Sequence, residues 1–441
     1  MKENADFPNI TRSQLTKKVL IITYYWPPAG GPGVQRWLKF VKYLPDFDVE
    51  PIVYVPENPE YPVLDQDLES EVSENTVIVK RKIWEPYALA SLFSGSKTKK
   101  ISSGIIPSEK KQKFSERLAL WIRGNLFIPD ARVLWVGPSV RFLQKYIAKH
   151  HIDTIITSGP PHSLHLIALK LKKKANLKWI ADFRDPWTTI GYHKDLKLSH
   201  FAENQHLKLE AEVLRNADHI LVTSRTTKAD FEKLTERPIT VITNGYDSEP
   251  ATVKSLDSKF SLAHIGSLLS KRNPIFLWQV LAEIMREVPS FKNHFELKLI
   301  GNVSRNVLES IKAYDLDGFV NAIGYVSHSE AIAHQRRSQV LLLIEINSIE
   351  TQSIIPGKLF EYMVSGRPII GIGPMGSDFA EIIQQTNTGI FVDYSQRDEL
   401  KSAILKYYSD FLNGSLQSHA VGLDQYSRKN LTKKLAELLH A

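Results

Sequence analysis

Short apolar runs alternate with amphipathic stretches along most of the chain. The run at Lys18–Thr23 is rich in Val and Ile, a Pro- and Gly-rich loop follows it, and residues 34–44 then carry apolar side chains at helical spacing. Strand, loop and helix in this order predict a parallel α/β sheet. Further strand-like runs of this half are 50–55, 76–81, 152–157, 178–182, 219–223 and 238–243.

A second series of the same kind follows a stretch without hydrophobic periodicity at 244–259. Its strand-like runs are 260–264, 295–300, 319–323, 340–345, 368–373 and 388–392, and helical patterns alternate with them. We therefore predict an α/β protein with two Rossmann-like doubly wound domains that face each other across a cleft. The expected parts are an N-terminal domain at 1–245, a linker at 246–259, a C-terminal domain at 260–426 and a final helix in 427–441.

Composition narrows the class of protein. The 441 residues are 43% hydrophobic and 24% charged, which excludes a mostly disordered chain, a collagen and a coiled coil. No apolar run reaches the roughly 20 residues that span a bilayer, and the first twelve residues do not resemble a signal peptide. The chain has no Cys, which excludes disulfides, iron–sulfur clusters and Cys-ligated zinc and favours a cytoplasmic location.

The formal net charge of +8 favours anionic partners, which include nucleotides, phosphates, nucleic acids and acidic membranes. Basic and aromatic residues do not interleave as they do on a nucleic-acid platform, so we expect no nucleic-acid partner. Two Asp-x-Asp triplets, at 65–67 and 315–317, lie in polar segments, and the 14 His show no paired-ligand spacing. We therefore expect no metal and no cofactor.

Two candidate segments follow predicted strands of the first half. Gly31 and Gly33 open a helix, and small residues there let backbone amides approach an anion; a tight connection is the alternative interpretation. Residues 157–165 (TSGPPHSLH) place His162 at a strand end, where an imidazole can bond a sugar hydroxyl or a phosphate. The alternative is a helix-entry turn that Ser163 caps.

The segment 180–187 (IADFRDPW) places Asp182, Arg184 and Asp185 directly after an apolar strand. Charges in such a position are costly unless they are paired or bind a ligand. In a functional interpretation these charges bind a ligand at the edge of the cleft. An internal Arg–Asp salt bridge that shapes the loop is the alternative.

The second half holds two further candidate segments. Lys271 and Arg272 follow the strand-end pair Gly266-Ser267 and precede a helix that begins at Pro274. Cations at a helix N-terminus have the unfavourable sign for its dipole, so an anion such as a diphosphate would fit between them. A solvated basic turn is the alternative interpretation.

The last candidate segment is a helix that opens at Pro356-Gly357. Lys358 lies in its first turn, and Glu361 follows three residues later on the same face. A surface Lys–Glu pair is the alternative interpretation. Gly366 ends this helix before the next strand.

Together, these segments resemble the GT-B glycosyltransferases, and specifically the retaining glycosyltransferase family 4. The resemblance covers most of the chain. Its carriers are YYWPPAGGPGVQR, TSGPPHS, ADFRDPW, VITNGYD, HIGSL…KRNP and PGKLFEYMVSGRPIIG.

The resemblance implies a role for each matching position. Glu361 would hold the donor ribose, Lys271 and Arg272 the donor diphosphate, and the Gly31–Gly33 loop would approach the phosphate and the acceptor. Gly266, Ser267 and Lys358 would complete the donor site, and His162 and Ser353 would face the acceptor or the sugar. The final helix would cross back onto the N-terminal domain.

Three positions depart from the family pattern. Ser353 stands where the family often has the first Glu of a Glu-x7-Glu pair, and Ser267 replaces the usual basic residue after the strand-end Gly. Arg184-Asp185 stands where the family often has His-Asp. These departures concern the identity of the donor sugar.

We therefore expect a metal-independent, retaining transferase that moves a sugar from a nucleotide-diphosphate sugar to a glycan or lipid-linked acceptor. UDP is the expected nucleotide, and surface polysaccharide synthesis is the expected pathway. Arg272, Asp182, Arg184 and Asp185 are the expected catalytic residues, with cations stabilising the leaving diphosphate. A nucleotide-sugar epimerase and a noncatalytic sugar-binding protein are the alternatives.

Peripheral contact with the inner face of a membrane is expected from the basic stretch 97–113 followed by an apolar helical stripe that includes Trp121. The alternative is a solvated loop and a stripe packed on the first domain.

Overall fold

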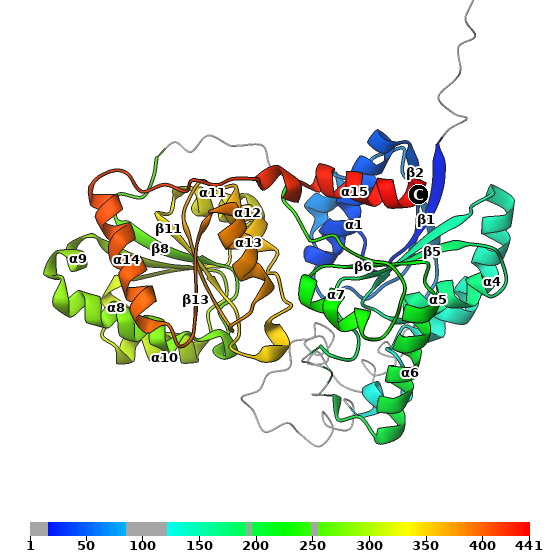
Figure 1. Cartoon of the computed structure of the whole chain (residues 1–441), viewed down its shortest axis with the longest axis horizontal. Coiled ribbons are helices and arrows are strands. Elements are labelled where there is room, and N and C mark those ends of the chain that lie inside the picture. The colour runs from blue at the N-terminus through cyan, green and yellow to red at the C-terminus, as the bar shows by residue number, and fades with distance from the viewer. Residues whose placement is uncertain (1–15, 85–120, 191–192, 194–195, 248–254) are drawn as a thin grey trace, which may run out of the picture. The chain divides into compact units, whose positions relative to one another are not determined.

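The computed structural model describes residues 16–84, 121–190, 193, 196–247 and 255–441 (Figure 1). The chain divides into two compact units. Unit 1 comprises Met1–Thr223, Thr227–Ile242 and Leu431–Ala441, and unit 2 comprises Ser224–Thr226 and Thr243–Asn430. Each unit is built on one parallel sheet.

The sheet of unit 1 has seven strands in the order β3-β2-β1-β4-β5-β6-β7. Their bounds are β1 Lys17–Ile22, β2 Val49–Pro56, β3 Val77–Arg81, β4 Thr154–Gly159, β5 Lys178–Phe183, β6 His219–Val222 and β7 Ile239–Val241. Its helices are α1 Pro32–Tyr43, α4 Val133–His150, α5 Ser163–Lys172, α6 His200–Asn216, α7 Arg225–Glu232 and α15 Arg428–His440, with short 3-10 turns η2 Leu44–Phe47 and η3 Gln66–Glu69. The predicted parallel α/β arrangement is confirmed.

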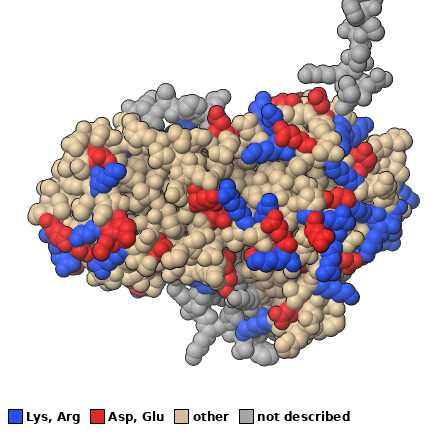
Figure 2. All heavy atoms as spheres, in the orientation of Figure 1, with Lys and Arg blue, Asp and Glu red and all other residues tan. Residues whose placement is uncertain are grey.

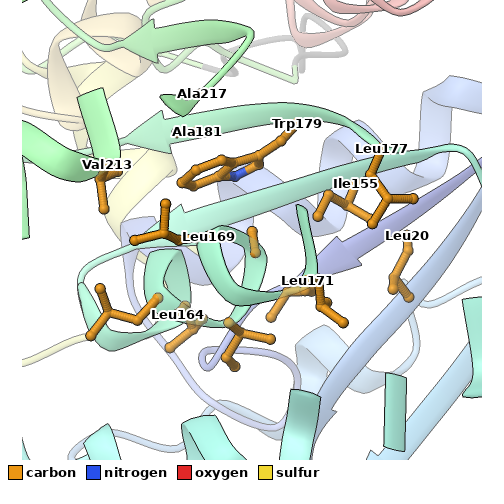
Figure 3. Close-up of a cluster of buried hydrophobic side chains, with 14 of the residues drawn as sticks. Leu20, Ile155, Leu164, Leu169, Leu171, Leu177, Trp179, Ala181, Val213 and Ala217 are labelled. Atoms are coloured by element: carbon orange, nitrogen blue, oxygen red, sulfur yellow. The ribbon is translucent and has the colours of Figure 1, made fainter. Parts of the chain in front are cut away.

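Apolar cores cover both faces of this sheet. Trp179 of β5, Ile155 of β4 and Leu169 of α5 belong to a cluster that also includes residues of α4 and α6 (Figure 3). The opposite face packs against α1 and α15. Because helices cover both faces, the central strands are continuous apolar runs rather than alternating ones.

Helix α15, which is distant in sequence, completes the core of unit 1. Its Leu431, Leu435 and Leu439 lie in one cluster with Val19 of β1 and Trp37 of α1 (Figure 1). Lys17 Nζ donates to the carbonyl of Leu439 and Lys178 Nζ donates to that of Leu438 at 2.8 Å. Cations at a helix C-terminus stabilise its dipole, so two lysines hold the end of α15.

The sheet of unit 2 has six strands in the order β10-β9-β8-β11-β12-β13. Their bounds are β8 Phe260–Ile265, β9 Phe295–Ile300, β10 Val320–Gly324, β11 Val340–Ile344, β12 Ile369–Gly373 and β13 Gly389–Asp393. Its elements outside the sheet are η6 Ser270–Arg272, α8 Ile275–Glu287, α9 Pro289–His294, α10 Arg305–Ala313, η7 Asp317–Phe319, α11 His328–Arg337, η8 Ile349–Thr351, α12 Lys358–Met363, α13 Asp378–Thr386, α14 Arg397–Leu412 and η9 Leu423–Tyr426.

The strand orders define one ligand-binding edge in each unit. Chain order reverses between β1 and β4 in unit 1 and between β8 and β11 in unit 2. Open α/β sheets bind ligands beyond the carboxyl ends of the strands at such a switch point. Among the described residues, no helix is long and apolar enough to cross a membrane.

Candidate functional site

Arg184 joins three segments at the switch-point edge of unit 1. It follows β5, and its Nε donates to the carbonyl of Gly159 at the end of β4 at 3.3 Å, while Nη2 donates to the carbonyl of Pro160. A Cβ added at Gly33, in the first turn of α1, would lie 1.8 Å from Nη1 of Arg184. Glycine at position 33 therefore lets the guanidinium lie directly against the helix start, so the structure brings these two predicted residues together.

Gly31 caps the same helix with its backbone at φ 104°, a conformation that favours glycine. Within the described part of the chain, no side chain caps α1, and Pro32 occupies its first turn. Helix N-termini attract anions through their amides and dipole. The start of α1 together with Arg184 can therefore bind a negatively charged group.

Asp182 is completely buried beneath this edge. Its carboxylate accepts hydrogen bonds from Arg36 Nη2 at 2.9 Å, Trp37 Nε1 at 2.9 Å and Ser158 Oγ at 2.8 Å. Asp182 thus ties β5 to α1 and β4. The internal salt bridge is present with Arg36 rather than Arg184 as its partner, and this burial favours a structural role for Asp182 over contact with substrate.

Asp185 lies beside Arg184 at the same edge. Burial raises the pKa of Asp185, and the Arg184 guanidinium opposes that shift. Burial also lowers the pKa of Arg184, which Asp185 and Asp182 oppose. The charge on each of these two side chains therefore stabilises the charge on the other.

His162 is 6% exposed and stacks on Trp187 with ring centroids 4.9 Å apart. In the described structure neither of its ring nitrogens has a hydrogen-bond partner. Burial holds the pKa of His162 well below its usual range, with His165 and Arg184 adding to the effect. The ring is therefore neutral and packed inside, away from the surface position that the sequence suggests.

The predicted cap of α5 differs from the observed one. Asp130 Oδ2 accepts from the backbone amide of Ser163 at 2.9 Å, and Oδ1 accepts from Ser163 Oγ at 2.8 Å. Asp130 lies 33 residues before Ser163, so no local spacing in the sequence indicates this contact. A carboxylate already neutralises the start of α5, which leaves the start of α1 as the anion-binding helix end of this edge.

In unit 2, Lys358 of α12 reaches back to the end of β8. Its Nζ donates to the carbonyl of Ile265 at 3.1 Å and lies 3.3 Å from Nε2 of His264. A Cβ added at Gly266 would lie 3.4 Å from the same Nζ, and Gly266 itself has φ 119°. The predicted residues Gly266 and Lys358 therefore meet at the switch point.

Arg272 forms a bidentate ion pair with Glu345, the residue that follows β11. Nε and Nη2 each donate at 3.1 Å to the two carboxylate oxygens. The Glu345 side chain is 1% exposed and that of Arg272 is 32% exposed. The anion expected between Lys271 and Arg272 is thus supplied in part by the protein, while the Arg272 side chain stays partly exposed.

Glu361 of α12 accepts a hydrogen bond from Gln335 Nε2 at 2.8 Å, and its Oε1 lies 3.7 Å from His328 Nε2. Its side chain is 28% exposed. The alternative interpretation, a surface Lys358–Glu361 pair, differs from the structure, in which each residue contacts other elements. Glu361 keeps an accessible carboxylate that can accept hydrogen bonds from hydroxyl groups.

The remaining predicted residues lie around this edge. Ser267 and Lys271 are exposed and Ser353 is half-buried. Glu345 and His264 belong to the site although the sequence analysis does not name them as site residues. A charged residue directly after the apolar run 340–344 is the signal that could have indicated Glu345. Among the described residues, no cluster of His, Asp or Glu is arranged to hold a metal ion.

Two family models match the chain. The Glycosyltransferase Family 4 model matches residues 105–250, and the Glycosyl transferases group 1 model matches residues 259–410. Together they cover more than half of the chain. A search of curated proteins finds no significant match.

Solved structures share the fold at low sequence identity. Sucrose-phosphate synthase from Thermosynechococcus elongatus is 15% identical with a TM-score of 0.58, covering 96% of this chain and 98% of its own. HepE from Anabaena, solved with UDP-glucose, is 13% identical with a TM-score of 0.58 and coverages of 96% and 99%. A variant of TarM from S. aureus, solved with UDP and alpha-GlcNAc-glycerol among its ligands, is 11% identical with a TM-score of 0.56 and coverages of 97% and 100%.

The strand orders, the two switch-point edges and the two family matches agree with one another. The chain therefore belongs to the GT-B glycosyltransferases and consists of a family 4 domain followed by a group 1 domain.

Proposed function

We propose that the protein transfers a glycosyl group from a UDP-sugar to a hydroxyl of a glycan or lipid-linked acceptor in surface polysaccharide synthesis. The observation that carries the donor side of this proposal is the cluster of Gly266, Lys358, Arg272 and Glu361 at the switch-point edge of unit 2. Two cations and an accessible carboxylate there match a diphosphate and a ribose. The HepE and TarM structures, solved with UDP-glucose and UDP, support UDP as the nucleotide.

The chemistry follows from the charge that develops during transfer. As the bond from the sugar to the diphosphate breaks, negative charge grows on the leaving phosphate, and preorganised cations stabilise it. Arg272 and Lys358, with Lys271 at the surface, would supply that stabilisation without a metal. Retention of anomeric configuration is proposed from the family resemblance. Addition of EDTA should leave turnover unchanged, and NMR of the product should show the donor's anomeric configuration.

At unit 1, Arg184 and the start of α1 would bind an anionic part of the substrates, and Asp185 would orient the acceptor. His162 and Asp182 would act indirectly, because both are buried. The expectation that the Gly31–Gly33 loop and the Lys271/Arg272 pair share one diphosphate concerns both units together and stays a prediction.

Substitution of Arg272 tests the donor site. Arg272→Lys keeps a positive charge for the buried Glu345 but loses the planar fork, so the fold should persist. We expect turnover of a UDP-sugar to fall by roughly 100-fold, the scale of one transition-state contact. Wild-type turnover in a variant with unchanged thermal unfolding would contradict the assignment.

Glu361 tests the nucleotide side of the same site. Glu361→Gln should weaken UDP binding by about 1–3 kcal/mol, the scale of hydrogen bonds to charged groups. Calorimetric titration with UDP measures this change. An unaltered affinity would remove Glu361 from the nucleotide site.

One assay separates transfer from the alternatives. A transferase releases UDP in proportion to the acceptor that is glycosylated, whereas an epimerase changes the sugar while it remains attached to UDP or releases it without an acceptor. A noncatalytic protein binds the donor without turnover. A panel of UDP-, GDP- and ADP-sugars with and without acceptor distinguishes the three.

We also propose that unit 1 carries a surface that contacts the cytoplasmic face of a membrane peripherally. Trp121 is 44% exposed, and Arg141, Lys145 and Lys149 of α4 are exposed. Figure 2 shows Lys and Arg side chains gathered over the part of unit 1 where α4 lies. The stretch 97–113 and the apolar positions up to 118 lie outside the described residues. Binding to anionic vesicles should weaken with salt, since screening acts over about 10 Å at 0.1 M; no binding at low salt would contradict the proposal.

A further inference from the structure

Lys358 is a cation without a carboxylate partner in the described structure. Its two hydrogen-bond partners are the carbonyl of Ile265 and the imidazole of His264, and both are neutral acceptors. By contrast, Arg272 has Glu345 as a bidentate partner. Lys358 is half-buried. An ammonium that has lost much of its hydration is stable only when it is paired, so a site that leaves it unpaired favours either loss of its proton or arrival of an anion.

His264 fixes the direction in which the amine points. The ring is completely buried, and its Nδ1 lies 3.2 Å from the carbonyl of Leu342 in β11. The backbone of Ser267 also faces this ring. A carbonyl can only accept, so with the Leu342 carbonyl at hydrogen-bond distance we assign the proton to Nδ1 and direct the Nε2 lone pair to Lys358 Nζ. With one hydrogen directed to His264 and one to Ile265, a protonated Lys358 has one hydrogen left for a ligand beside Gly266.

The charged groups that face Lys358 come from each neighbouring element. Arg272 of η6 disfavours the ammonium, whereas Glu345 after β11 and Glu361 within α12 favour it. His264 of β8 is the remaining titratable neighbour, and burial keeps its pKa well below the usual range, so it stays neutral. The protonation state of Lys358 therefore depends on two opposing effects. Burial and Arg272 favour the neutral amine, whereas the two carboxylates favour the ammonium.

We propose that His264 is a positioning residue for Lys358 and that the pair makes donor binding proton-coupled, so that Lys358 takes up a proton when the diphosphate arrives. This inference rests on the proposed function, because it assigns the diphosphate of a nucleotide-sugar to this site. The diphosphate supplies the negative charge that the free site lacks.

The sign of the pH dependence follows from linkage. Burial, followed by Arg272, lowers the pKa of Lys358 to about 7 in the free protein. A bound diphosphate raises it, because the opposite charge stabilises the ammonium. The donor therefore binds best below pH 7, and its affinity falls by about tenfold per pH unit above that value.

Calorimetric titration in two buffers tests the coupling. UDP-glucose is the probe, because UDP carries a terminal phosphate that itself titrates near pH 6; GDP-glucose and ADP-glucose are run in parallel. At pH 8, titrations in phosphate and in Tris should differ by the ionisation heat of about 0.9 proton taken up per ligand, and at pH 6 by about 0.1. Binding with no proton uptake at pH 8 overturns the inference and leaves the proposed function standing. If none of the three sugars binds, the proposed function fails and this inference fails with it.

Three variants assign the proton. Lys358→Met should abolish the uptake and weaken binding at pH 6, whereas Lys312→Met, at an exposed position of α10, should change neither. His264→Asn keeps a donor for the Leu342 carbonyl but removes the ring nitrogen that faces Lys358. Water then enters beside the amine, and the pH midpoint of binding should rise toward that of an ordinary lysine. A midpoint equal to that of the wild type would show that His264 does not govern Lys358.

Discussion

Asp182 loses all contact with water in the folded protein and depends on Arg36, Trp37 and Ser158 for its hydrogen bonds. Asp182→Asn removes the charge that Arg36 requires, and breaking a buried ion pair costs about 3–5 kcal/mol. Urea unfolding should show that loss. Asp230→Asn is the matched control: its pair with Lys233 is exposed on both sides, so the change should stay below about 1 kcal/mol. Equal effects at both sites would contradict the structural role of Asp182.

The contact between Gly33 and Arg184 gives a second prediction. Gly33→Ala places a methyl group where the guanidinium now lies, so Arg184 must move. We expect turnover to fall by about tenfold, because the displaced guanidinium no longer meets the substrate in its original position; this corresponds to about 1.4 kcal/mol of lost transition-state stabilisation. Gly137→Ala in α4 meets no atom within 4 Å and should stabilise the protein by up to about 1 kcal/mol with normal activity. An active Gly33→Ala enzyme would exclude this position of Arg184 from the mechanism.

The buried imidazoles make unit 1 sensitive to acid. Burial lowers the pKa of His165 to about 3 and that of His206 to about 4. Both rings are neutral in the folded protein but protonate near pH 6.5 when unfolded, so their contribution to stability is complete above 6.5 and declines as the pH falls toward 4. Within that window, each ring should lower the free energy of unfolding by about 1.4 kcal/mol for each unit by which the pH falls. Urea unfolding at pH 7, 6 and 5 measures the slope, which His165→Gln should reduce.

For single residues, the sequence predicts which positions lie at the site better than it predicts their hydrogen-bond partners. Arg184 and Gly266 lie where the sequence predicts strand ends, and Gly33 and Lys358 lie where it predicts helix starts, because the apolar runs along the chain determine those boundaries. The partner of Asp182 is Arg36, 146 residues away, and that of Arg272 is Glu345, 73 residues away. Such pairs depend on which strands become neighbours, and periodicity along the chain does not contain that information.

Among the elements, α15 joins unit 1 through its apolar face and through lysines at its last carbonyls. Leu435 is completely buried in the cluster with Val19 and Trp37. Leu435→Ala should destabilise unit 1 by about 2–5 kcal/mol through lost burial and a cavity. Leu412→Ala, at an exposed position of α14, should have little effect. Thermal unfolding followed at tryptophans tests both, and similar stability for the two variants would contradict the packing of α15.

The predicted strands agree closely with the structure, whereas one long helix, α4, is not among the elements predicted from the sequence. The strand run at 340–345 corresponds to β11 Val340–Ile344, and the run at 178–182 corresponds to β5. Helix α4 contains Gly137 and Pro138 in its first turns, which usually mark a break. Pro138 is the sixth residue of α4 and lies past the first turn, and the helix continues through it with the loss of one i→i−4 backbone hydrogen bond.

On the scale of the whole molecule, the two units present similar switch-point edges with different chemistry. Unit 2 has Lys358 and Arg272 beside Gly266, and unit 1 has Arg184 beside Gly33. If the nucleotide binds unit 2, hydrogen exchange should slow in 264–272 and 357–363 when UDP is added, because a ligand stabilises the segments that it contacts. Exchange in β2 and β3 should stay unchanged, and the Lys358→Met variant should show less protection. Protection confined to unit 1 would contradict the assignment of the nucleotide site to unit 2.

The position of α15 has a consequence for how the protein is made. The ribosome completes residue 242 about 190 residues before it reaches Leu431, a delay of about 10 to 40 s at ordinary translation rates. During that time the nascent unit 1 exposes the apolar face of β1 and α1 that α15 later covers. Unit 2 can fold before unit 1 is complete, so the usual N-terminal-first order is reversed. Chaperones that hold unfinished apolar surfaces should therefore associate with the nascent chain until its last helix emerges.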